Sequence, residues 1–181
     1  LQDTKAAEPP EYWDNPQYNQ PDQPVIGVSY DDAVRFAVWL SAQLGVAKRL
    51  PTEDEWEKAA RGGQDVIYPW GDQNPSDGVR ANYGGNGRYS ATSPVGRFEA
   101  GKNALGLYDM AGNVWEWTNS LYKNYPYIYD DGRENSNAEG NRSLRGGSWA
   151  GDFSTLRIAD RLGLGPFSTK WDIGFRCAKS P

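Results

Sequence analysis

Two short segments, Arg145-Gly146-Gly147-Ser148-Trp149 and Gly174-Phe175-Arg176-Cys177, frame the C-terminal part of the chain. The glycine pair in the first segment indicates a turn, and the second segment is typical of a short strand. Residues 150–172 between them contain no cysteine and follow neither the alternation of a strand nor the spacing of a helix. The sequence therefore indicates a fixed frame around a segment without regular structure.

The length and composition predict one domain, or slightly more, with a core built largely from aromatic residues. The chain has 181 residues, of which 38% are hydrophobic and 13% aromatic, including eight Trp and eleven Tyr. Each large ring buries about 150–250 Å², so a fold rich in loops can still have a core. The net charge of −5 argues against a nucleic-acid partner. No apolar run is long enough to span a membrane.

Histidine is absent from the chain and cysteine occurs once. The sequence therefore lacks the commonest general base and the commonest metal ligand, and it cannot form an internal disulfide or a cysteine-based zinc site. A metal site must use oxygen ligands, which favours calcium. The first residue is Leu1 rather than Met, which indicates a processed or recombinant chain.

Capping residues mark two helices. Ser29 and Asp32 form a capping box, and Gly45 ends the first predicted helix. Thr52 and Glu55 form a second box before the next helix. The residues that we expect to point inward are Ala33, Phe36, Ala37, Leu40 and Leu44 in the first helix and Trp56, Ala59 and Ala60 in the second.

The chain changes character after the second helix. Turn signals recur every few residues, and short apolar and aromatic pieces such as residues 105–108 and 114–117 lie between them. This order predicts an α+β domain of two helices and short antiparallel strands with much irregular loop. Residues 25–181 form the predicted domain, residues 123–142 a long surface loop, and the Pro-rich residues 1–24 an N-terminal arm packed on the domain.

Seven phrases carry a family resemblance: Gln23-Pro-Val-Ile-Gly-Val-Ser-Tyr30, Arg49-Leu-Pro-Thr-Glu-Asp-Glu-Trp-Glu-Lys-Ala-Ala-Arg-Gly62, Tyr68-Pro-Trp-Gly71, Ser93-Pro-Val95, Gly106-Leu-Tyr-Asp-Met-Ala-Gly-Asn-Val-Trp-Glu-Trp117, Arg145-Gly-Gly-Ser-Trp149 and Gly174-Phe-Arg-Cys177. Over residues 10–178 their order and spacing resemble the formylglycine-generating-enzyme, or sulfatase-modifying-factor, family. The resemblance implies a C-type lectin fold. The family's usual opening segment, upstream of the Pro-rich arm, is not part of this sequence.

Glu116 lies between Trp115 and Trp117, which we expect in the core. A carboxylate buried there without a partner is costly, so Glu116 should pair with an arginine or bind a cation. The resemblance implies a structural calcium site at this turn, made by the side chains of Asp109 and Glu116 and the backbone oxygens of Gly112 and Val114. Such irregularly spaced oxygen ligands suit calcium.

The resemblance also implies a second calcium site, which begins at Asn82 and Tyr83. It requires an acidic residue where this chain has Gly87 or its neighbour Asn86. We therefore do not expect a second ion.

Enzymes of this family oxidise a substrate cysteine with a copper ion held by two cysteines. The matching positions fall near Gly151 and Leu156, which can neither bind copper nor act as redox thiols. A related kind of enzyme uses an iron site of histidines, which this chain lacks. Cys177 is expected to be a small buried hydrophobic residue. The sequence therefore predicts a protein that is not an enzyme and that holds no copper, iron or zinc.

Residues 150–172 resemble the variable region of diversity-generating-retroelement variable proteins, which use the same lectin-fold branch for ligand display. Arg157, Ala159 and Arg161 alternate like framework positions. The resemblance implies that the exposed, ligand-binding positions are Ala150, Gly151, Asp152, Ser154, Thr155, Ile158, Asp160, Leu162, Leu164, Phe167, Lys170, Trp171 and Asp172. Aromatic anchors among adaptable polar residues are typical of a binding surface.

Three functions and one structural alternative follow. The first is a non-catalytic binding module for a protein or cell-surface ligand, which implies display on a cell or virion surface. The second is an accessory domain that recognises a fixed protein partner. The third is an enzyme of unfamiliar chemistry, which requires a pocket of converging carboxylates and tyrosines. Alternatively, residues 150–172 are an ordinary connection whose Phe153, Leu156 and Trp171 belong to the core.

Overall fold

The computed structural model of the chain describes residues 8–84 and 89–179. Its helices are α1 (Tyr30–Leu44) and α2 (Glu53–Arg61), with three short 3-10 turns, η1 (Pro75–Asp77), η2 (Glu99–Gly101) and η3 (Phe153–Leu156). Both predicted capping boxes are confirmed, and each helix ends at a glycine in the left-handed conformation. The start and end of both helices are therefore determined by residues in their first turn and just beyond their last.

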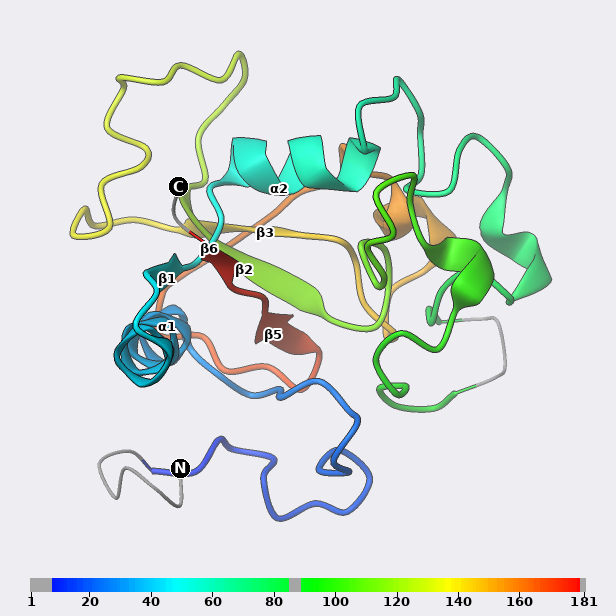
Figure 1. Cartoon of the computed structure of the whole chain (residues 1–181), viewed down its shortest axis with the longest axis horizontal. Helices are drawn as coiled ribbons and strands as arrows, with labels where there is room; N and C mark the ends of the chain where they lie inside the picture. The colour runs from blue at the N-terminus through cyan, green and yellow to red at the C-terminus, as the bar shows by residue number, and fades with distance from the viewer. Residues whose placement is uncertain (1–7, 85–88, 180–181) are drawn as a thin grey trace.

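The strands are short and form two sheets: β1 (Lys48–Arg49), β2 (Trp115–Leu121), β3 (Arg142–Arg145), β4 (Leu162–Leu164), β5 (Ile173–Phe175) and β6 (Ala178–Lys179). The larger sheet has the order β4-β3-β2-β5, and β1 pairs with β6 (Figure 1). The α+β prediction is confirmed. One pair departs from it, because β5 runs parallel to β2. The segment after β3 brings the chain back to the start of β2, where the N–H of Trp115 donates to the carbonyl of Asp172.

The core lies between the larger sheet and the two helices. Trp115 and Trp117 are buried as predicted, and Trp117 packs with Leu144 and Ile173 from the neighbouring strands. Helix α2 lies across β2 and β3 (Figure 1), and its Trp56 forms a second cluster with Met110. Aromatic rings thus fill the space between elements that supply few aliphatic side chains.

The predicted inward face of α1 is only partly correct. Ala33 and Ala37 are buried, but Phe36 is 43% exposed and Leu44 is 55% exposed. The helix lies at one side of the molecule and contacts mainly β1 (Figure 1), so only a narrow stripe of it meets the core. Phe36 packs instead on Trp39 and Phe175 near the surface.

The segment between β2 and β3 projects from the body as a long loop (Figure 1). It was expected at the surface, but Arg133 and Arg142 within residues 123–142 are buried. Arg142 donates hydrogen bonds to three backbone carbonyls of this loop and to the carbonyl of Asn119 on β2. These hydrogen bonds stabilise the conformation of the loop, which could not be predicted from its polar composition. Among the described residues, neither helix has the length and apolar character to cross a membrane.

The Pro-rich N-terminal segment lies along the side of the molecule opposite α2 (Figure 1). Glu11 accepts a hydrogen bond from Thr169 at 2.9 Å, the carbonyl of Asp22 accepts from Val95, and the Gln23 amide donates to the carbonyl of Thr92. Residues 8–24 thus contact the body at several points, whereas residues 1–7 of the predicted arm lie outside the described residues. The division into arm and domain stays a prediction.

Candidate functional site

The segment framed by the two phrases starts and ends beside the same strand. Glu116 of β2 lies opposite Arg145 on one side and Gly174 on the other. The turn after β3 needs glycine, because Gly147 has φ +73 and a Cβ there would lie 2.6 Å from the carbonyl of Thr155. Residues 150–172, here called the 150–172 surface, connect β3 to β5. They include η3 and the edge strand β4, so the expectation of a segment without regular structure is only partly correct.

Most of the predicted binding positions are accessible. The exposed ones are Ala150, Asp152, Ser154, Phe167, Lys170 and Trp171, and the half-buried ones are Gly151, Thr155, Asp160, Leu162, Leu164 and Asp172. The structure brings these positions onto one continuous segment but does not test whether they bind a ligand. Their role as ligand-binding residues stays a prediction.

The expected exposure of Ile158 is wrong. Its side chain is 1% exposed and lies in the cluster of Trp56, Ala60 and Met110 under α2. Its backbone N–H donates to the carbonyl of Ile67 at 2.9 Å. Ile158 thus anchors the segment to the body of the domain. The sequence has no periodicity from which this burial could have been predicted.

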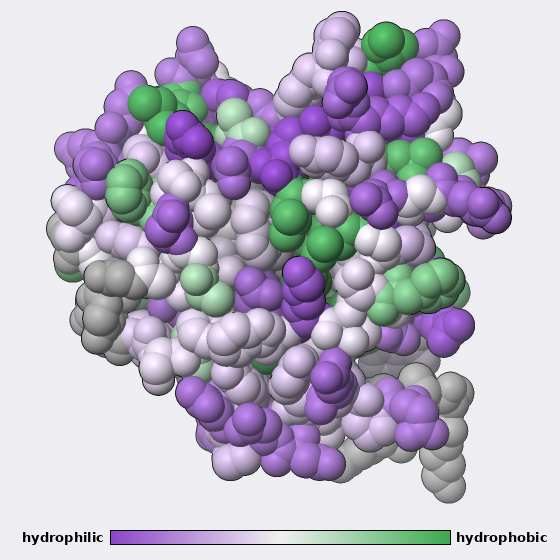
Figure 2. Space-filling view, turned by 180° about the vertical axis from the view of Figure 1, so that it is seen from behind, coloured by the Kyte–Doolittle hydropathy of each residue, from purple (hydrophilic) through white to green (hydrophobic). Residues whose placement is uncertain are grey.

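The alternative that Phe153, Leu156 and Trp171 belong to the core is correct for one of the three. Leu156 is fully buried with Tyr68 and Tyr83. Phe153 is 51% exposed, Trp171 44% and Phe167 79%. Figure 2 shows one face of the molecule, on which hydrophobic residues form a small central group and separate spots among hydrophilic ones. The 150–172 surface likewise combines uncovered aromatic side chains with polar neighbours.

Trp171 has a fixed place at one end of this surface. Its ring meets that of Trp149 edge to face, with centroids 4.8 Å apart, and Trp149 in turn contacts Tyr18 of the arm. The next residue, Asp172, accepts a hydrogen bond from the hydroxyl of Ser148 at 2.8 Å. A partly exposed aromatic ring held on a buried one is a rigid contact group.

A buried ion pair supports the 150–172 surface from below. The guanidinium of Arg161 donates to both carboxylate oxygens of Glu53, at 2.5 and 2.6 Å, and lies between the rings of Tyr122 and Tyr125. Glu53 also accepts from the hydroxyl of Ser143. Of the three predicted framework residues, only Arg161 is anchored in this way, because Arg157 and Ala159 are exposed. The burial of Glu53 could not be predicted, since acids in a first helical turn are usually solvated.

The charges of the 150–172 surface are mixed. Hydrogen bonds from the hydroxyl and the N–H of Ser154 hold the pKa of Asp152 below its usual value. Burial raises the pKa of Asp160. Arg157 and Lys170 add exposed positive groups. The surface therefore offers contacts of both signs rather than a single strong field.

A depression at the edge of the surface is lined by Arg157 and Ala159, by Arg61 at the end of α2, and by four residues of the following loop, Asp65, Val66, Ile67 and Asp72. It contains two carboxylates but no tyrosine, and Arg61 already donates to Glu57 at 2.8 Å. This arrangement is not the pocket of converging carboxylates and tyrosines that the enzyme hypothesis requires.

Of the two alternatives for Glu116, the structure has the arginine. Arg176 donates to both carboxylate oxygens at 2.6 Å, and the indole N–H of Trp56 donates at 2.7 Å. Asp109 accepts from the N–H of Gly96, and burial raises its pKa. The residues therefore fit a calcium ion only in part, since Glu116 would have to exchange Arg176 for the ion.

Calcium binding at this turn accordingly remains a proposal. The carbonyl of Gly112 accepts a hydrogen bond from the N–H of Val114. No group of three or more acidic or cysteine side chains that could hold a metal occurs among residues 8–84 and 89–179. Of the second site, which we did not expect to hold an ion, Asn82 is buried, whereas Asn86 and Gly87 lie outside the described residues.

The residues near which the copper-binding cysteines are expected by resemblance are a half-buried glycine, Gly151, and the core residue Leu156. Cys177 is half-buried rather than buried, and burial raises the pKa of its thiol. The thiol form is therefore favoured over the nucleophilic thiolate at neutral pH.

The fold and the site define a lectin-like α+β domain that presents an irregular C-terminal segment on its surface. The chain belongs to the family of the sulfatase-modifying factor enzyme 1-like domain, which matches residues 2–181. The family resemblance and the C-type lectin fold are thereby confirmed.

Three comparisons illustrate the range of this family. The chain is 37% identical to a protein named formylglycine-generating enzyme from Thermomonospora curvata, over 97% of the chain and 64% of that protein. It is 38% identical to inactive C-alpha-formylglycine-generating enzyme 2 of Bos taurus, over 86% of the chain and 50% of that protein. Treponema denticola variable protein 1 has a similar structure, with a TM-score of 0.81 and 27% identity over 97% of this chain and 78% of that one.

These likenesses confirm the predicted resemblance to a variable protein of this branch. The chain spans 64% or less of the curated relatives named above. Because those relatives include a named enzyme and a protein named inactive, the family alone does not decide between catalysis and binding.

The support of the 150–172 surface can be tested by removing Arg161. Arg161→Met leaves the Glu53 carboxylate buried without its bidentate partner, so we expect the free energy of unfolding in urea to fall by about 3–5 kcal/mol. Arg49→Met is the control, because Arg49 pairs with Glu55 in a partly exposed bridge that contributes about 0–1 kcal/mol. Equal losses in the two variants would contradict a supporting role of Arg161.

The calcium proposal can be tested by thermal unfolding. An ion bound only by the folded state raises the melting temperature, so calcium should raise it and EDTA should lower it. Asp109→Ala should remove this dependence, whereas Asp130→Ala, at an exposed acid of the long loop, should keep it. Equal melting temperatures with calcium and with EDTA would show that the partner of Glu116 is Arg176 and not a calcium ion.

Proposed function

We propose that the protein is a non-catalytic ligand-binding module whose 150–172 surface is diversifiable, as in a retroelement variable protein. The observation that carries this proposal is the solvent exposure of Phe153, Phe167 and Trp171 on one segment with little regular structure. Large exposed rings on a rigid support give contact area at a small cost in conformational entropy. The likeness to Treponema denticola variable protein 1 supports the same function.

The chemistry of the chain supports a role without catalysis. It lacks histidine throughout, and the positions that match the family's copper ligands are Gly151 and Leu156. The relative from Bos taurus, which is named inactive, is an example of the family without the named activity. Neither copper nor iron nor zinc is part of the proposal.

The proposed partner is a protein or a cell-surface ligand, and the proposed location is a cell or virion surface. The mixed charges around Asp152, Arg157 and Lys170 suit a polar rim around aromatic anchors. An accessory domain with one fixed protein partner is the second candidate. It is favoured by the identity to relatives that are not named variable proteins.

The binding surface can be tested with a phage-displayed library of random peptides selected on the wild-type chain. We expect Phe167→Ser and Trp171→Ser to weaken the selected peptides by at least about tenfold, because truncated aromatic anchors dominate interface energies. Val38→Ser is the control, since Val38 is 64% exposed on α1, outside the surface. Peptides that lose affinity equally in the control, or in none of the variants, would contradict the proposal.

Sequencing of sister gene copies distinguishes the two candidates. A variable protein should show differences confined to the codons of residues 150–172, at positions that are adenine in an imperfect repeat of the coding end. Arg161, which holds Glu53, should stay constant. A 150–172 region that is identical among copies, or varies no more than the rest of the gene, favours the accessory domain with a fixed partner.

A further inference from the structure

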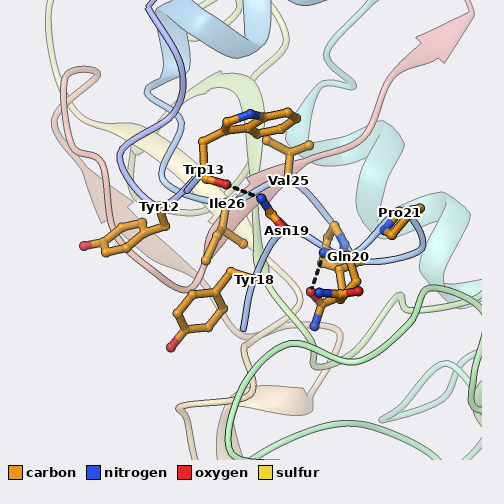
Figure 3. Close-up of a pocket in the computed structure, with 10 residues that line it drawn as sticks. Tyr12, Trp13, Tyr18, Asn19, Gln20, Pro21, Val25 and Ile26 are labelled. Atoms are coloured by element: carbon orange, nitrogen blue, oxygen red, sulfur yellow. Dashed lines mark hydrogen bonds between the residues drawn. The ribbon is translucent and has the colours of Figure 1, made fainter. Parts of the chain in front are cut away.

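The N-terminal arm contains a pocket that borders the 150–172 surface. Its volume is about 140 Å³, and three aromatic residues, Tyr12, Trp13 and Tyr18, line it (Figure 3). Ile26 is buried at its base, and Val25 is 42% exposed at its edge. Tyr12 and Tyr18 project to the same side in this view, and their rings meet edge to face with centroids 6.1 Å apart.

The pocket is uncharged. Its remaining lining residues are Asn19, Gln20, Pro21, Gln23 and Pro24, so no acidic or basic side chain takes part. The amides are bonded within the arm. Asn19 donates to the carbonyl of Trp13 at 2.5 Å (Figure 3), and Gln20 donates to the carbonyl of Pro16 at 2.8 Å. The walls are therefore held in place before a ligand arrives, which reduces the entropy that binding costs.

The pocket is continuous with the proposed binding surface. Tyr18 contacts Trp149, and Trp149 contacts Trp171. On the other side of the arm, Glu11 is bonded to Thr169. A ligand seated on Trp171 thus lies next to an aromatic pocket whose residues fall outside the diversified segment.

We propose that this pocket binds a proline-containing, extended segment of the protein ligand. Aromatic grooves without charge suit polyproline II segments, whose rings stack on aromatic faces and whose conformation is already restricted before binding. A charged segment would lose hydration in the pocket without gaining an ionic partner. This inference rests on the proposed function, because it assigns a partner chemistry to the edge of the same surface.

The experiment is a titration of the isotope-labelled chain with a polyproline peptide, followed by NMR. We expect saturable shifts of the Trp13 indole N–H and the Val25 amide, and no shifts with a matched peptide in which glycine replaces the prolines. Trp13→Ala should weaken polyproline binding by at least about tenfold. Val25→Ser, a milder change at the exposed edge, should weaken it in the same direction if Trp13→Ala fails to fold. Val38→Ala on α1 is the control and should bind like the wild type.

Two results would overturn the inference: polyproline that causes no saturable shift, or binding that is unchanged in both pocket variants. Either result leaves the proposed function standing if the library peptides still depend on Phe167 and Trp171. Conversely, if the affinity of the library peptides does not change in Phe167→Ser and Trp171→Ser, the proposed function is contradicted, whether or not polyproline binds. The two failures are therefore distinguishable.

Discussion

The carboxylate of Glu53 is the point on which the architecture depends, because it joins parts of the chain that are distant in sequence. It accepts hydrogen bonds from Arg161, just before β4, and from Ser143 on β3. The backbone N–H of Glu53 donates to the hydroxyl of Ser120 on β2. A carboxylate without water is costly unless both oxygens are bonded, and here both are. Helix α2, the sheet and the returning segment are thus held at one buried position.

That anchoring, together with β4, frees the other residues of the 150–172 surface from a structural role. The segment is attached at Leu156, Ile158 and Arg161, which are buried or bonded to the body. It then pairs with β3 along β4 and continues into β5 at Ile173. The exposed side chains, among them Phe153, Phe167 and Trp171, lie outside these attachments. This explains why the sequence of the segment shows no periodicity. Each residue that points inward makes its own local contact with the body, and these contacts do not recur at the spacing of a helix or a strand.

The sequence was informative where structure depends on nearby residues. The capping boxes at Ser29 and Thr52 and the aromatic core around Trp117 were predicted correctly, because a cap or a short strand is decided within a few positions. The exposure of Phe36 could not be predicted, since it depends on what lies beside α1. The burial of Glu53 could not be predicted either, because its partner is 108 residues away. For Glu116 the sequence left arginine and a cation open, and only the fold brings Arg176 beside it.

The buried position of Ile158 limits how freely the 150–172 surface can vary. A polar side chain there would lie among Trp56, Ala60 and Met110 without a hydrogen-bond partner, which costs about 1–3 kcal/mol. A substitution at Phe167, which is mostly exposed, carries no such cost. Residues of this surface can therefore be varied without loss of fold stability only where the side chain faces water. A mechanism that randomises the whole segment produces useful variants only when position 158 stays apolar.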